Sequence, residues 1–351
     1  MKTTHDFRKI GVWQTAFIGD AVLTLPLLAA LHERNPKAEI HFWVRAGLEE
    51  LFAGQPGVHA VHGFDKRGTH KALVHAVRLG RQISKQNFDL WISAHRSLRS
   101  ALVARSSRIP ERIGYDSPWF SKLAYTTAVP RRFAELEEIE RLHQLLTPLG
   151  MTLPAPEARL NLPESAKKQA ESIWHENGLT GDRVLGVHPG STWPTKCWLP
   201  EHFAEVIRQA ANQSITVLVF GGPNEKQLVA EIIEKAGGCG RYVHNMAGKL
   251  SLVELAAVIG RLEACLTNDS GPMHLAWTQG VPLVSLFGPT VRSLGFFPRG
   301  DRSTVLETEL DCRPCGLHGP KRCPKGHHEC MKAITPTMVW DALAPLFEEH
   351  H

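Results

Sequence analysis

Short apolar stretches alternate with amphipathic stretches along almost the whole chain, and this alternation restricts the fold more than any other feature. The segments between the apolar stretches have the length and periodicity of helices, as at 21–33, 200–212 and 224–236. Such alternation is typical of open parallel sheets with helices on both faces. It therefore predicts an α/β protein with strands at 10–15, 39–44, 58–63, 89–93, 184–188, 215–220, 264–267 and 283–287.

The alternation pauses at 151–163, an extended segment that contains Pro154, Pro156 and Pro163. We place a domain boundary there, since 351 residues are enough for two domains of ordinary size. The prediction is a first domain over 1–160 and a second over 161–334, each doubly wound and Rossmann-like, facing each other across a cleft. A terminal helix within 335–351 is expected to pack back on the first domain.

The chain has no segment suited to a membrane span or to export. Its longest uncharged apolar stretch, 21–31, is shorter than the roughly 20 residues that a spanning helix needs, and residues 1–8 have no signal-peptide core. The seven cysteines are an odd number and include three scattered single ones, which favours free thiols in a reducing compartment. We therefore expect a cytoplasmic protein.

Charge is distributed unevenly between the two predicted domains. Residues 1–160 carry 22 Lys and Arg against 15 Asp and Glu, whereas residues 161–351 carry 18 against 20. The excess is concentrated at 71–112, with nine basic residues and two acidic ones. A basic domain indicates an anionic partner, such as nucleic acid, anionic lipid or a phosphorylated substrate, although any single arginine here is better explained as part of a solvated helix face.

The first candidate site residue is Asp20, which follows the first strand in the turn Phe17–Asp20. Ligands of open α/β sheets bind at the carboxyl ends of strands, so this position faces the expected site. One interpretation is a helix N-cap that accepts backbone N–H bonds. The other is a carboxylate that accepts a proton from a substrate.

Two further loops follow strands of the second half. In Pro189–Pro200, the hydroxyls of Ser191 and Thr192 and the ammonium of Lys196 suit a diphosphate, unless the loop is an ordinary surface loop. In the segment 266–276 the last strand residues lead directly into Asp269, Ser270 and Gly271, and Pro272 suits the start of a helix. A helix N-terminus binds anions, and His274 in its first turn is placed to donate a hydrogen bond to an oxyanion. Neither a Walker loop nor a GxGxxG motif follows a strand.

These loops together resemble those of the lipopolysaccharide heptosyltransferases of glycosyltransferase family 9, which have the GT-B fold. The resemblance spans nearly the whole chain, and its last motif is highly specific. The matching segments are FIGDAVLTLPLLAAL, HPGSTWPTKCWLPEHFAEVI, FGGPNE, AGKLSLVELA, NDSGPMHLA and VPLVSLFGPT. The stretch after FGPT, Val291–Ser293, departs from the family pattern and leaves contacts from that loop in doubt.

The resemblance implies an inverting transfer of L-glycero-D-manno-heptose from ADP-heptose to the inner core of lipopolysaccharide, without a catalytic cofactor. Chain length and the Lys-x-Trp-x-Pro form at Lys196 favour the first heptose as acceptor. By the same resemblance Asp20 is the general base, and Lys196 contributes to catalysis by stabilising the departing diphosphate. The implied donor-binding residues are Ser191, Thr192, Lys196, Glu225, Leu250, Asp269, Ser270, Gly271 and His274.

Arg96 and Arg99 follow the fourth predicted strand and are expected to bind the phosphates and carboxylates of the acceptor. This interpretation explains the basic first domain better than nucleic acid does, because no nucleic-acid-binding module accompanies the basic run. The resemblance also places the protein at the inner surface of the inner membrane of a Gram-negative-type bacterium, where the lipopolysaccharide acceptor is exposed.

Four cysteines are clustered late in the chain, at Cys312, Cys315, Cys323 and Cys330, with histidines nearby. Their spacing is compatible with a structural zinc site, and free thiols are an equally good interpretation, whereas disulfides are disfavoured in a reducing compartment. Two other functions also remain open at this stage. One is a sugar-nucleotide epimerase or hydrolase on the same fold, and the other is a non-catalytic nucleotide-sugar-binding protein.

Overall fold

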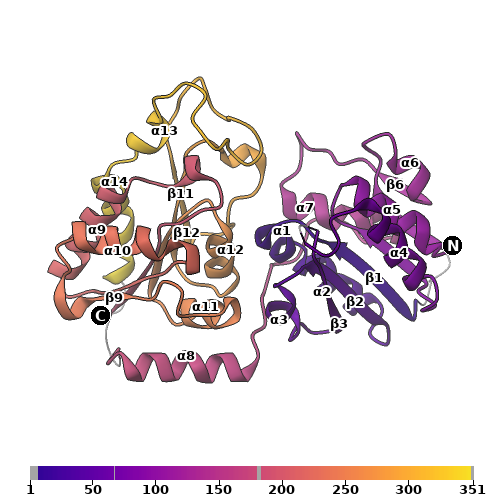
Figure 1. Cartoon of the computed structure of the whole chain (residues 1–351), viewed down its shortest axis with the longest axis horizontal. Coiled ribbons are helices and arrows are strands. Elements are labelled where there is room, and N and C mark those ends of the chain that lie inside the picture. Colours follow the sequence, from indigo (N-terminus) through magenta and orange to yellow (C-terminus); the bar gives the residue numbers. More distant parts are fainter. Residues whose placement is uncertain (1–6, 67, 180–182, 349–351) are drawn as a thin grey trace. The chain divides into compact units, whose positions relative to one another are not determined.

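The computed structural model describes residues 7–66, 68–179 and 183–348, and it divides into two compact units (Figure 1). Unit 1 is Met1–Asn161 and unit 2 is Leu162–His351, a division one residue from the expected boundary. Each unit contains one parallel six-stranded sheet within the described residues, with helices on both faces. No helix among these residues combines the length and the apolar character that a membrane crossing requires.

Unit 1 has the strand order β3-β2-β1-β4-β5-β6. The strands β1, β2 and β4 are buried almost throughout, as expected for a sheet covered on both faces, and their core includes the packed rings of Trp13, Trp43 and Trp91. The elements are β1 (Lys9–Gln14), α1 (Ile18–Leu23), α2 (Leu25–Arg34), β2 (Glu39–Arg45), α3 (Glu49–Phe52), β3 (Val58–Phe64), α4 (Leu73–Ile83), β4 (Leu90–Ser93), α5 (Leu98–Ser107), β5 (Glu111–Tyr115), α6 (Ser121–Ala124), β6 (Thr127–Val129), α7 (Glu138–His143) and the 3-10 helix Gln144–Leu149.

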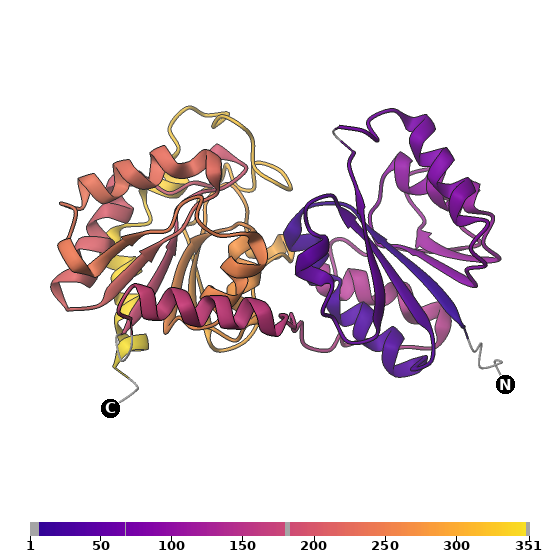
Figure 2. The ribbon, with the colours of Figure 1, turned by 60° about the horizontal axis from the view of Figure 1, so that its bottom comes forward.

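Unit 2 has the strand order β12-β11-β10-β7-β8-β9. Counted from β9, this is the third, second, first, fourth, fifth and sixth strand of the unit, the same order as in unit 1. Its helix α8 packs on α11 along the outside of the unit (Figure 2). The main elements are α8 (Glu164–Glu176), β7 (Val184–His188), the 3-10 helix Pro194–Lys196, α9 (Pro200–Asn212), β8 (Thr216–Val219), α10 (Lys226–Lys235), β9 (Val243–Asn245), α11 (Leu252–Ile259), β10 (Ala264–Asn268), α12 (Gly271–Thr278), β11 (Leu283–Phe287), β12 (Ser303–Glu307), α13 (Glu329–Lys332) and α14 (Pro336–Leu343).

Each sheet has one point where the winding reverses direction, and these points locate the candidate site. In unit 1 the reversal lies between the neighbouring strands β1 and β4, and in unit 2 it lies between β7 and β10. In doubly wound folds the loops diverge at such a point, at the carboxyl edge of the sheet, and ligands bind there. The loops singled out in the sequence, at 15–20, 189–199 and 269–274, all leave these strands.

The first helix differs from its prediction. We expected a turn at Phe17–Asp20 followed by one helix over 21–33, whereas Ile18 already begins α1 and a separate α2 begins at Leu25. The break has two local causes. Pro26 lacks a backbone N–H to continue α1, and the Thr24 hydroxyl donates to the carbonyl of Asp20.

The terminal helix packs on elements of its own unit. Helix α14 contacts α9 and β11, and Val339, Trp340 and Leu343 are buried in the core of unit 2. Its packing on unit 1 stays a prediction. The short strands β5, β6, β9 and β12 were not predicted, since their stretches are less uniformly apolar than those of the central strands.

Candidate functional site

Asp20 lies in the first turn of α1, immediately after β1. Its side chain accepts a hydrogen bond of 3.1 Å from the backbone N–H of Phe17, the residue that precedes the helix. Asp20 is thus the third residue of a short helix whose N-cap is Phe17. The interpretation of Asp20 as the N-cap is therefore wrong. Only one carboxylate oxygen is engaged by this bond, so the second is available to a substrate.

The environment of Asp20 favours its protonated form. Burial of the carboxylate, with a smaller contribution from the negative charge of Glu138, raises the pKa of Asp20 from 3.8 to about 6, against the opposing effects of the Phe17 hydrogen bond and Arg131. A carboxylate with a pKa near the working pH takes up and releases protons efficiently, which is the property of a general base. The role of Asp20 as a general base stays a prediction, which this raised pKa suits.

Other polar side chains of unit 1 are placed at the same edge of the sheet. Lys66 follows β3 and donates to the Thr15 carbonyl at 2.8 Å, and His95 follows β4 and shares a hydrogen bond of 3.1 Å with the Thr15 hydroxyl. Burial, together with the positive charges of Lys66 and Arg131, lowers the pKa of His95 to about 3. His95 is therefore neutral at pH 7 and suited to exchange hydrogen bonds with a substrate hydroxyl.

Arg131, which follows β6, forms a two-pronged ion pair with the buried Glu138, with distances of 2.8 and 2.7 Å to its two carboxylate oxygens. Arg141 donates to the same carboxylate at 2.9 Å. The sequence analysis missed Lys66, His95, Arg131 and Glu138. All but Glu138 come just after a strand, so a search of every strand end would have found three of them.

Arg96 and Arg99 lie at the start of α5, after β4. Arg96 is exposed and donates to the Ser117 hydroxyl at 3.2 Å, whereas Arg99 is half-buried and donates to the Lys71 carbonyl at 2.6 Å. Arg96 is therefore the better placed of the two to turn toward an anionic ligand, and Arg99 also holds the segment before α4.

In unit 2, Lys196 and Asp269 form a buried ion pair. The ammonium of Lys196 lies 2.6 Å from Asp269 Oδ2, and the Thr290 hydroxyl donates to the same oxygen at 2.6 Å. The three side chains come from the loops after β7, β10 and β11 and are almost completely buried. Thr290 is the last residue of the FGPT segment, just before the stretch Val291–Ser293 that departs from the family pattern. The structure shows that this segment braces Asp269.

The loop after β7 is also anchored to β10 by Asn268. This buried amide accepts a hydrogen bond from the backbone N–H of Trp198 at 3.0 Å and donates to the Pro189 carbonyl at 2.7 Å. Both ends of the Pro189–Trp198 loop are thereby held against the strand that precedes Asp269. Such anchoring preorganises the loop before any ligand binds.

His274 lies in the first turn of α12 and is buried, with its Nδ1 lacking a hydrogen-bond partner. Burial is the main cause that lowers the pKa of His274 to about 4, since the nearby charges of Asp269 and Lys196 act in opposite directions. The imidazole is therefore neutral. Ser270 and Gly271, at the N-terminus of α12, are partly exposed and leave the first backbone N–H groups of this helix open to an anion.

The remaining predicted donor residues lie on neighbouring loops of unit 2. Thr192 is exposed, and Ser191 is half-buried and accepts a hydrogen bond from the backbone of Trp193 at 3.3 Å. Glu225 accepts from the Gly222 N–H at 2.7 Å and lies 3.9 Å from the buried His188. A Cβ at Gly190 would lie 1.8 Å from this carboxylate, so a side chain there would displace Glu225 from its present position. Leu250 is half-buried just before α11.

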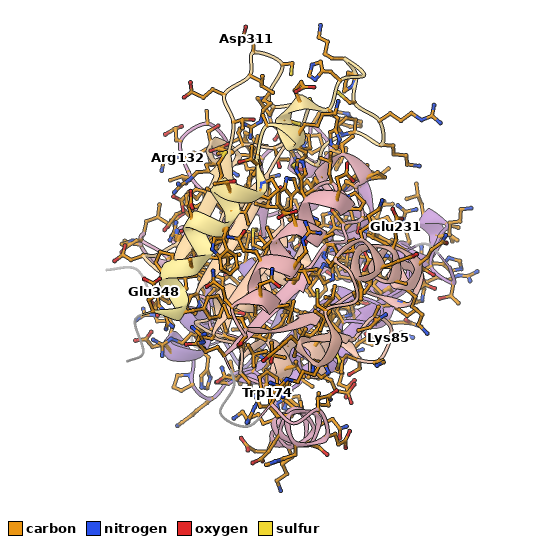
Figure 3. The ribbon with its side chains drawn as sticks, turned by 90° about the vertical axis from the view of Figure 1, so that its left-hand side faces the viewer. Lys85, Arg132, Trp174, Glu231, Asp311 and Glu348 are labelled. Carbon is orange, nitrogen blue, oxygen red and sulfur yellow. The ribbon has the colours of Figure 1, made fainter. Side chains whose placement is uncertain are left out.

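Three of the late cysteines, Cys312, Cys315 and Cys323, lie in the long loop after β12, which also carries Asp311 (Figure 3), whereas Cys330 lies in α13. Cys312 Sγ is 3.9 Å from His327 Nε2, and burial raises the pKa of the Cys330 thiol to about 11. Among the described residues, one group of three histidine, cysteine or acidic side chains has all its ligand atoms within 4.8 Å of one another, and the cysteines are not in it. A zinc ion at the cysteines would therefore require the thiols to come closer together.

Two doubly wound units with polar loops at both switch points define the class of the protein, a GT-B glycosyltransferase. A family model described as glycosyltransferase family 9 (heptosyltransferase) matches residues 76–322. The chain belongs to this family and is a glycosyltransferase.

Relatives and solved structures agree with this assignment over the full length. The chain is 27% identical to lipopolysaccharide heptosyltransferase 2 of Salmonella typhimurium, over 97% of this chain and 99% of that protein. It is 25% identical to lipooligosaccharide heptosyltransferase 2 of Campylobacter jejuni, over 98% and 99%. Among solved structures it is similar to a family 9 glycosyltransferase of Veillonella parvula, with a TM-score of 0.85, 25% identity and coverage of 97% and 98%. It is also similar to ADP-heptose lipopolysaccharide heptosyltransferase II of Escherichia coli, with a TM-score of 0.76, 25% identity and coverage of 98% and 100%.

Proposed function

We propose that this chain transfers L-glycero-D-manno-heptose from ADP-heptose to the first heptose of a lipopolysaccharide inner core, with inversion at the anomeric carbon. The full-length similarity to heptosyltransferases that add to lipopolysaccharide or lipooligosaccharide supports the substrate class. The observation that carries the mechanism is Asp20, whose pKa of about 6 and position at a switch point suit a general base.

In the proposed reaction Asp20 takes the proton of an acceptor hydroxyl while that oxygen bonds to the anomeric carbon. The bond from this carbon to the diphosphate breaks on the opposite face, and ADP leaves with its electron pair. The raised pKa lets Asp20 hold the proton until the product departs. Lys66 and Arg131, which flank this edge of unit 1, favour an acceptor that carries phosphate or carboxylate groups.

Unit 2 is the proposed donor-binding half. The open N–H groups at Ser270 and Gly271 are suited to the diphosphate, as are the hydroxyls of Ser191 and Thr192. Lys196 lies in the same loop as Ser191 and Thr192, and its charge is paired with Asp269 before the donor arrives. In the same proposal Leu250 covers the adenine, and Glu225 contacts the ribose.

We also propose that unit 1 binds an anionic bilayer, at the cytoplasmic face of the inner membrane, through the surface formed by α4, α5 and α6. These helices are adjacent along one side of the unit (Figure 1). The exposed apolar side chains on these helices are Leu73, Val74, Leu98 and Leu123, and Trp119 lies just before α6, with exposed fractions between 42% and 77%. A hollow of about 580 Å³ between α4 and α5 is lined by Arg81, Lys85, Arg105 and Arg108, without an acidic residue.

This combination of basic and apolar groups fits an anionic lipid surface better than it fits a protein partner. Lys and Arg are attracted to acidic headgroups, while tryptophan and leucine insert into the interfacial region. The position suits an enzyme whose acceptor is a membrane lipid. The proposal also keeps the expectations that catalysis needs no cofactor and that nucleic acid is not a partner. The late cysteines hold a structural zinc ion or stay free thiols, and elemental analysis of the purified chain distinguishes the two.

The decisive experiment is incubation of the purified chain with ADP-heptose and a panel of core acceptors truncated one sugar at a time. Mass spectrometry of the products identifies the acceptor, and NMR of the new linkage gives its anomeric configuration. Addition of one heptose to the acceptor that ends in the first heptose supports the proposal. Consumption of ADP-heptose without any acceptor would instead indicate a hydrolase or epimerase.

A further inference from the structure

An imidazole cluster lies at the edge of the sheet in unit 1, away from every residue used above. Strand β3 is the edge strand, and it pairs with β2. The register shifts between Ile40 and His41, since Ile40 pairs with Val58 and His41 pairs with Ala60. His59 is therefore the extra residue of a β-bulge, and a bulge redirects the side chain it carries.

The bulge brings His59 to the same place as Glu39 and His41 of β2. One ligand atom of each of the three side chains lies within 4.8 Å of the other two. His41 Nε2 and Glu39 Oε2 are 3.7 Å apart. Two ligands of a tetrahedral zinc ion, each about 2.1 Å from the metal, lie about 3.4 Å from each other, so this pair is already close to the required spacing.

His41 carries the strongest indication of a missing partner. Its side chain is only 9% exposed, and its Nε2 atom is buried without a hydrogen bond. Its other ring nitrogen, Nδ1, shares a hydrogen bond of 2.9 Å with His62 Nε2. Metal-bound histidines have this arrangement, because a hydrogen bond at one nitrogen orients the ring and the other nitrogen binds the metal.

Two neighbours complete the site. The rings of His41 and His62 are stacked at 5.2 Å with an interplanar angle of 4°, which holds both in place. Lys9 Nζ lies 3.5 Å from Glu39 Oε2 and is the positive charge that a bound cation would displace. Because Lys9 is partly exposed, it is free to turn toward solvent when this happens.

We propose that Glu39, His41 and His59 bind a divalent transition-metal ion, with His62 as the residue that positions His41. Two imidazoles and one carboxylate are a ligand set that suits Zn²⁺. The ion would connect the edge strand β3 to β2 at the bulge, where the regular ladder of hydrogen bonds is interrupted. The role is structural, and it does not depend on the reaction that the chain catalyses.

The test is calorimetric titration of the untagged, chelator-treated full-length chain with ZnCl₂. We expect His59→Ala, at an exposed position that leaves the core intact, to remove one binding event. We expect His62→Ala to weaken the same event about 10- to 100-fold. The matched control is His175→Ala, an exposed histidine on α8, which should bind zinc as the unaltered chain does. A Cys312→Ser/Cys315→Ser variant should retain this event, which separates it from any zinc at the cysteines.

Thermal unfolding gives a second measurement. Zinc at about a hundredfold above its Kd should raise the Tm of unit 1 by about 5–10 °C in the unaltered chain and leave the Tm of His59→Ala unchanged. The proposal is wrong if His59→Ala binds zinc with unaltered stoichiometry and affinity, or if the cysteine variant loses all zinc binding.

Discussion

The ammonium of Lys196 lies 2.6 Å from the carboxylate of Asp269, in a pair that is almost completely removed from water. The two residues are 73 positions apart, and their contact connects the loops after β7 and β10 at the switch point of unit 2. The pair means that Lys196 is not a free cation waiting for a diphosphate. Its charge is already balanced, so a donor bound as proposed would share it with Asp269.

This pairing predicts a specific pattern of stability. Lys196→Met should lower the free energy of unfolding by about 3–5 kcal/mol, because it leaves the Asp269 carboxylate buried without its partner. Adding Asp269→Asn should restore most of that loss, since the unpaired charge is then gone. ADP-heptose affinity, measured by calorimetry, should remain low in both variants.

The matched control is Lys235→Met, which breaks the exposed pair of Lys235 and Glu231 on α10 and should cost less than about 1 kcal/mol. Urea unfolding gives the free energies. Unaltered stability of Lys196→Met would show that the pair does not matter for the fold. A double variant no more stable than the single one would show that the charge is not the cause.

Asp20→Asn should lower turnover at least about 100-fold while ADP-heptose binding stays near normal. The asparagine oxygen still accepts the Phe17 N–H bond, so α1 should persist. Because burial raises the folded pKa of Asp20 to about 6, above its unfolded value, its ionised form destabilises the fold. The variant should therefore be at least as stable as the unaltered chain at pH 8. Steady-state kinetics, donor calorimetry and thermal unfolding check these three outcomes.

The control for Asp20 is Glu33→Gln, an exposed carboxylate of α2, for which turnover should not change. Near-normal turnover of Asp20→Asn would show that Asp20 is not the general base and has only a structural role in α1.

The same pKa predicts the pH dependence of the reaction. A base must be ionised, so turnover in the unaltered chain should fall as the pH decreases through about 6 and level off above pH 7. His95, whose pKa of about 3 keeps it neutral throughout, should not contribute to this range. A pH–rate profile at saturating substrates measures the effect. A limb centred near pH 4, the ordinary value for a carboxylate, would contradict the assigned environment of Asp20.

Neutralising Arg96 and Arg99 should raise the acceptor KM and leave donor affinity nearly intact. A charge-assisted hydrogen bond is worth about 1.5–3 kcal/mol, so removing one such bond to the acceptor should raise KM about 10- to 150-fold. Arg96→Gln should change the acceptor KM with less effect on the fold than an Arg99 variant, because Arg99 also donates a hydrogen bond to the Lys71 carbonyl. The measurement is a pair of substrate titrations, with Arg208→Gln on α9 as the control. Weaker donor binding in the Arg96 variant would mean that unit 1 does not serve the acceptor as proposed.

The α4–α6 surface predicts binding to anionic vesicles. The unaltered chain should sediment with vesicles that contain phosphatidylglycerol and remain free of vesicles of phosphatidylcholine alone. Trp119→Ser should weaken this binding because serine does not insert into the membrane interface. Arg81→Gln/Lys85→Gln should also weaken it, because each positive charge that is removed contributes up to about 1 kcal/mol of binding free energy. Raising the salt concentration should reduce the binding of the unaltered chain, because exposed charges are screened over about 8–10 Å. Equal binding to both kinds of vesicle, or by all variants, would contradict the proposed surface.

The sequence by itself predicted two α/β units, a boundary at 160/161 that lies one residue from the division of the structure, and loops after the central strands as the candidate site. Buried parallel strands are apolar throughout, so a local pattern was enough to find the loops that follow them, in which Asp20, Lys196 and Asp269 lie. Local patterns failed where apolar character was weak, as in β5, β6, β9 and β12.

The tertiary structure decided how these residues act. The pairing of Lys196 with Asp269, and the placement of Glu138 and Arg131 around Asp20, depend on strand order and on loops far apart in the chain. The pKa of Asp20 is set mainly by the loss of water around it, and the approach of His59 to His41 depends on a one-residue bulge. Desolvation and register arise only when the chain is folded, because they are properties of neighbours in space and not of neighbours in sequence.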